Sequence, residues 1–109
     1  MSKYLQADEN QHHYETIIRS EHLKELNRIN TFREMSNEYQ EKIQTKYAAD
    51  QISHEDFGKA VHYYDQMTML TKICLLQIEN NMISDDYEHI MKQVAKNVDK
   101  LEELAKEVK

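Results

Sequence analysis

The segment Met67–Ile78, with the sequence MTMLTKICLLQI, decides how this chain folds. Its apolar residues recur at the three- and four-residue steps of an α-helix, so one face of the segment packs on a core. In a helix that begins near Phe57, this core face continues toward the N-terminus. Its members are Phe57, Ala60, Val61, Tyr64, Met67, Thr68, Thr71, Cys74, Leu75 and Ile78.

A second apolar set lies off that core face. Met69, Ile73 and Leu76 follow one another at steps of four and three, which places them on the opposite side of the helix. A helix that is apolar nearly all round needs more than one neighbour. We therefore expect the middle element of a bundle, an oligomer interface or a surface that receives a partner. The interface residues predicted in this segment are Met69, Leu70, Ile73 and Leu76.

Local signals bound this helix at both ends. Ser53 has the side chain of an N-cap, and Ile52 is placed to pack on Phe57 as a hydrophobic staple. Asn80 and Asn81 follow the last apolar position, and Asn tolerates the left-handed conformation that closes a helix. The sequence therefore predicts a helix over residues 54–80.

A third helix is predicted over residues 85–108. Either Ser84 caps it, or Asp85 does so with Glu88 as the partner in a capping box. Its apolar positions make a face that is wide enough to cover a core. They are Tyr87, Ile90, Met91, Val94, Val98, Leu101, Leu104, Ala105 and Val108.

The first fifty residues contain neither Gly nor Pro. With Asp8 as a possible N-cap, we expect a frayed arm over residues 1–7 and a long helix over residues 9–48. The apolar pattern changes phase near Ser20, so a break there remains open. The chain is thus expected to be a single all-α domain over residues 1–109: an antiparallel three-helix bundle or an extended helical hairpin, or four helices if the first one breaks.

The predicted first helix is longer than the two that follow it. Short connections make neighbouring helices antiparallel, so the later helices cover only its C-terminal part. Tyr14, Ile17 and Ile18 lie at helical spacing in the uncovered part. These three residues are therefore also predicted to be part of a protein interface.

Charge and composition exclude several classes of partner. The net charge is -6, so the chain as a whole lacks the positive field that attracts nucleic acid or anionic lipid. No stretch approaches the ~20 apolar residues of a membrane span, and the N-terminus lacks the apolar region of a signal peptide. The one cysteine, Cys74, is expected to be a small buried hydrophobe. We expect a cytoplasmic protein.

No catalytic arrangement is present in the sequence. Cys74 has no His three or four residues away, and there is no phosphate loop or dinucleotide motif. We therefore expect neither an enzyme nor a cofactor. Six histidines leave a metal-carrying bundle as an alternative, through the Glu-x-x-His spacing of Glu9 with His12 and the related Asp86 with His89.

The leading hypothesis is a non-enzymatic protein–protein interaction module of the adaptor, chaperone or inhibitor type. It would present an apolar helix face to a protein partner or to itself, as a homodimer. A second alternative is a transcription regulator that acts on DNA or on a DNA-binding protein. Direct DNA contact is disfavoured because acidic residues crowd the start of the third helix, ahead of its polar and basic residues. These are Lys92, Gln93, Lys96, Asn97 and Lys100.

Overall fold

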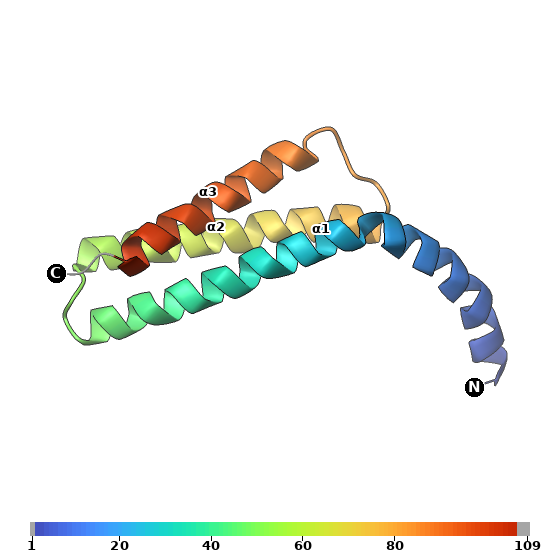
Figure 1. The fold of residues 1–109 in the computed structure, drawn as a ribbon, viewed down its shortest axis with the longest axis horizontal. Coiled ribbons are helices and arrows are strands. Elements are labelled where there is room, and N and C mark those ends of the chain that lie inside the picture. Colours follow the sequence, from blue (N-terminus) through green and yellow to red (C-terminus); the bar gives the residue numbers. More distant parts are fainter. Residues whose placement is uncertain (1, 107–109) are drawn as a thin grey trace.

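The computed structural model describes the backbone of residues 2–106 and the side chains of residues 22–106. Within that range it has three α-helices and no strand: α1 (Ser2–Ala48), α2 (His54–Glu79) and α3 (Tyr87–Lys106). Each helix runs antiparallel to the one before it, and the three pack side by side (Figure 1). The predicted all-α antiparallel three-helix bundle is confirmed.

α1 is one continuous helix, so the alternative of four helices with a break near Ser20 is wrong. The predicted start is also wrong, because α1 begins at Ser2 and includes the residues that were expected to form a frayed arm. Residues 2–8 contain neither Gly nor Pro, so nothing in them stops the helix from continuing past Asp8. The N-terminal part of α1 curves and extends beyond the bundle (Figure 1).

The connection between α1 and α2 follows the predicted chemistry. The Ser53 hydroxyl accepts a hydrogen bond from the backbone N–H of Asp56 at 3.0 Å, as an N-cap does. Ile52 is buried, and Phe57 packs against the same cluster, which confirms the staple. The ring of Phe57 also stacks on Tyr47 with a centroid distance of 4.0 Å. These contacts fix the end of the bundle where α1 turns into α2.

At the connection between α2 and α3, the predicted closure of α2 is confirmed and the predicted start of α3 is wrong. Asn81 has a φ of 53°, so it closes α2 in the left-handed conformation, as expected. α3 begins at Tyr87 rather than at residue 85. Within the described residues, the Ser84 hydroxyl accepts no hydrogen bond from a backbone N–H of α3; the hydroxyl and the backbone N–H of Ser84 both donate to the Gln77 side-chain oxygen. Ser84 therefore ties the connection back to α2. The alternative cap, Asp85, stands two residues before α3 and so does not directly precede the helix.

The core lies along the shared axis of the three helices. Ile29, Ser36 and Ile43 are fully buried on α1 and are spaced one heptad apart. The predicted core face of α2 is confirmed in outline, although Val61 is exposed. α3 contributes the broadest face, as its pattern predicted. The buried residues of α2 and α3 are Ala60, Met67, Thr71, Cys74, Ile78, Tyr87, Met91, Val94, Val98, Leu101, Leu104 and Ala105.

Candidate interaction surface

Three large apolar side chains are exposed on the side of α2 that faces away from α1 and α3. Met69 is 60% exposed, Ile73 41% and Leu76 57%. We call these three residues the outer face of α2. Their exposure follows from the sequence pattern, because the other side of the same helix is filled by core residues. Single exposed apolar residues are common on proteins, whereas three together on one side of a helix make this side a candidate interaction surface.

Leu70 was assigned to the same surface, and its position differs. It is half-buried and packs against the cluster that contains Met67, Val94 and Val98. The reason is geometric: Leu70 follows Met67 by three residues and so lies toward the core edge of the helix. Leu70 therefore lies at the edge of the core, next to the outer face of α2.

A shallow open hollow lies at the C-terminal end of the outer face of α2. It is lined by Ile73, Leu76, Gln77, Asn80 and Met82, and we call it the α2 hollow. Its polar side chains are held in place, because Asn80 donates to the Leu76 carbonyl oxygen at 2.8 Å and Gln77 accepts from Ser84. The hollow is therefore open to solvent, with two hydrogen-bonded polar side chains and three exposed apolar ones around it.

The α2–α3 connection extends this apolar area, which sequence analysis missed. Met82 is 73% exposed, and Ile83 beside it is also exposed. Two large apolar residues in a seven-residue polar connection were the signal, since nothing in that connection requires them for turn geometry.

The N-terminal part of the predicted interface lies on the extension of α1. Tyr14, Ile17 and Ile18 belong to the segment of α1 that runs beyond the bundle (Figure 1). Their side chains lie outside the described residues, so their assignment stays a prediction. Among the described side chains, His22 is the first that links α1 to the α2–α3 connection, with its Nε2 2.9 Å from Oδ1 of Asn81.

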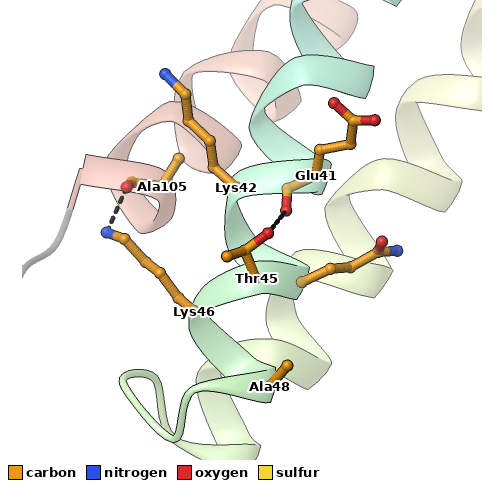
Figure 2. Close-up of a pocket in the computed structure, with 7 residues that line it drawn as sticks. Glu41, Lys42, Thr45, Lys46, Ala48 and Ala105 are labelled. Atoms are coloured by element: carbon orange, nitrogen blue, oxygen red, sulfur yellow. Dashed lines mark hydrogen bonds between the residues drawn. The ribbon is translucent and has the colours of Figure 1, made fainter.

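A second hollow lies between the C-terminal ends of α1 and α3. Figure 2 shows Lys42 and Lys46 at this site together with Glu41, Thr45 and Ala105. The Lys46 ammonium donates to the backbone carbonyl oxygen of Ala105, in the last turn of α3, and the Thr45 hydroxyl donates to the Glu41 carbonyl. A cation at a helix C-terminus complements the dipole of that helix. This site therefore stabilises the end of α3.

A polar cluster links α1 to the start of α3. The buried Tyr87 hydroxyl donates to the Glu25 carboxylate at 3.0 Å, and Arg28 bridges Glu25 and Glu88 at 3.1 and 3.0 Å. Burial, followed by the hydrogen bond to Glu25, raises the pKa of Tyr87 far above that of an ordinary phenol. Burial likewise raises the pKa of the nearby Cys74 thiol. Both groups stay protonated at neutral pH, so the cluster is structural and holds no activated nucleophile.

The metal-site residues proposed from sequence do not come together in the described region. Among the side chains of residues 22–106, no group of three His, Cys, Asp or Glu residues could hold a metal ion. Asp86 and His89 therefore gain no third ligand there. Glu9 and His12 lie outside the described side chains.

Some of the polar and basic residues that could have contacted DNA interact within α3 itself. The Asn97 amide donates to the Gln93 carbonyl oxygen, and Lys100 lies 3.8 Å from Glu103.

Within residues 2–106, no helix is both long enough and apolar enough to span a bilayer. No family model, curated protein or solved structure matches this chain. The outer face of α2 and the α2 hollow together form the candidate interaction surface of the described residues.

Proposed function

We propose that this chain is a non-enzymatic protein–protein interaction module, of the adaptor, chaperone or inhibitor type, that presents the outer face of α2 to another protein chain. The observation that carries the proposal is the exposure of Met69, Ile73 and Leu76 on one helix side. Their burial against a partner removes apolar area from water, which is the main favourable term in protein association.

The α2 hollow supports this proposal. Interface energy concentrates where an anchor side chain of one protein fills a pocket on the other. Tyr14, Ile17 and Ile18, which the sequence predicts as interface residues, would add a second apolar contact with the same or another chain. The module works in the cytoplasm, where the reducing conditions suit a chain with one buried thiol.

The test compares two immobilised baits in extract from the native host. One bait is the wild-type chain, and the other carries Ile73→Asp and Leu76→Asp. We expect at least one protein, which can be the chain itself, to bind the first bait and to be lost from the second. Two buried carboxylates without partners would weaken such a complex by well over tenfold.

The control variant carries Asn30→Asp and Gln44→Asp, which add the same two charges at exposed positions of α1. It should retain the same proteins as the wild-type chain. Circular dichroism and thermal unfolding establish that all three proteins are folded. If folded wild-type and Ile73→Asp/Leu76→Asp baits retain identical proteins, the outer face of α2 is not a docking surface.

A further inference from the structure

A coiled-coil seam runs along α2 on the side away from the bundle. Five residues on this side follow one another at alternating steps of three and four, which is the spacing of the a and d positions in a coiled coil. The three central ones are the outer face of α2, and they are exposed. The five seam residues are Gln66, Met69, Ile73, Leu76 and Asn80.

The α2 hollow has the form that such a seam uses to receive a side chain. Three of its lining residues belong to α2, and a fourth is the C-cap residue of that helix. They lie at relative positions 0, 3, 4 and 7, namely Ile73, Leu76, Gln77 and Asn80. In a coiled coil, each a or d side chain enters a hole formed by four residues of the facing helix. An apolar side chain from a helix lying along α2 would therefore fit this hollow.

Three charged residues flank the seam on one side, each directly before an a position: Asp65, Lys72 and Glu79. Lys72 and Glu79 are exposed and lie one heptad apart. Within the described side chains, neither forms an ion pair. Both occupy the g position, which immediately precedes an a position. Charges at such flanking positions set the partner and the orientation of a coiled coil.

We propose that this seam binds the same seam of a second copy of the chain, antiparallel, with the twofold axis between Ile73 and Leu76. Ile73 of each copy then enters the α2 hollow of the other and lies opposite Leu76. Lys72 of each copy faces Glu79 of the other, which gives two ion pairs. This arrangement rests on the proposed function and identifies the partner of the outer face of α2.

Other alignments of the two helices lose these features. If the twofold axis lay one layer nearer the N-terminus of α2, between Met69 and Ile73, the Lys72 side chains of the two copies would face each other. It also places Gln66, a polar residue, over the α2 hollow. A parallel pair brings Lys72 opposite the uncharged Gln77. Facing like charges are destabilising. An axis between Gln66 and Met69 would pair Asp65 with Lys72, but it would place the polar Gln66 opposite Met69. Charge and apolar matching together therefore select the axis between Ile73 and Leu76.

The symmetry of the seam indicates a second copy rather than an unrelated protein. The same helix carries the apolar side chain Ile73 and the α2 hollow that would receive it. It also carries both members of the proposed ion pair, Lys72 and Glu79. These complementary groups lie on either side of one point, between Ile73 and Leu76, as a twofold interface requires.

The two copies of α2 overlap over residues 70–79, which is about 15 Å of helix and contains the central pair Ile73 and Leu76. Met69 of each copy lies just beyond this overlap, opposite Asn80 of the other. Such a contact lies at the small end of specific interfaces, so we expect micromolar affinity.

The test is sedimentation equilibrium of the full chain from about 1 to about 500 μM. We expect the wild-type chain to dimerise, and Lys72→Glu or Glu79→Lys alone to weaken dimerisation by roughly tenfold, since each turns two attractive pairs into two repulsive ones. An equimolar mixture of the two variants should dimerise as well as the wild type, because every flanking pair is again of opposite charge. Lys96→Glu, on α3, is the matched control and should have no effect.

Each other outcome overturns the proposal. A wild-type chain that stays monomeric to 500 μM removes the second copy as partner, whereas the proposed function survives if the bait comparison still finds a protein that needs Ile73 and Leu76. A dimer that is unaffected by Lys72→Glu, or one that the mixture fails to restore, has another register or another surface. A dimer that persists in the folded Ile73→Asp/Leu76→Asp variant does not use α2.

Discussion

Replacing Ser36 by Ala should stabilise the protein, although it removes a hydrogen-bonding group from the core. Ser36 is 0% exposed, and its hydroxyl has no hydrogen-bond partner. It occupies a position that Ile29 and Ile43 fill one heptad on either side. A buried polar group without a partner costs about 1–3 kcal/mol of desolvation free energy, which the alanine side chain does not incur.

Two smaller effects modify this gain. Alanine has a helix propensity better than that of serine by about 0.5 kcal/mol. The lost oxygen atom leaves a small cavity, which offsets a fraction of a kcal/mol. We therefore expect Ser36→Ala to raise the free energy of unfolding by about 1.5 kcal/mol and the melting temperature by roughly 6 °C.

Urea unfolding and differential scanning calorimetry measure both quantities. The matched control is Ser53→Ala, the same chemical change at a hydroxyl that accepts a hydrogen bond from Asp56, which should instead cost about 1 kcal/mol. If Ser36→Ala is neutral or destabilising, the Ser36 hydroxyl has a favourable partner in the core and the reasoning is wrong.

Two further predictions concern single substitutions. Tyr87→Phe removes the hydrogen bond to Glu25 and should lower the free energy of unfolding by about 1.5 kcal/mol at neutral pH, measured by urea unfolding. Because the pKa of Tyr87 is raised in the folded state, the unfolded chain loses this proton first, so wild-type stability falls as the pH rises above about 10; the variant should show a shallower fall, and an unchanged slope would contradict the cause. Gly58→Ala should add about 1 kcal/mol in the same assay, since a Cβ there meets nothing within 4 Å and the backbone is already helical; a loss of stability would mean that Gly58 is needed for a close contact.

Most of the fold could be predicted from periodicity and capping. The α2 core face and the Ser53 cap were predicted because each depends on residues close together in sequence. Two local predictions were wrong for a related reason. The start of α1 and the cap of α3 each depend on a competition between several acceptable arrangements, and at Ser84 a side chain seven residues earlier, Gln77, competes for the hydroxyl.

The candidate surface was predicted in part. The opposite-face spacing of Met69, Ile73 and Leu76 was visible in sequence, and their exposure depends on which helix sides α1 and α3 cover. The α2 hollow could not be predicted, because it depends on the path of the connection that carries Met82. Leu70 shows the same limit: a residue at the edge between two faces is placed by tertiary packing, and spacing alone does not decide its side.

The continuity of α1 links the two ends of the molecule mechanically. Its backbone is helical without a break from Ser2 to Ala48, so the curved segment beyond the bundle (Figure 1) and the part that forms one wall of the bundle are a single helix. A protein that binds the protruding end of α1 would therefore determine the orientation of the whole bundle. The angle at which α1 is held would decide where the rest of the molecule points.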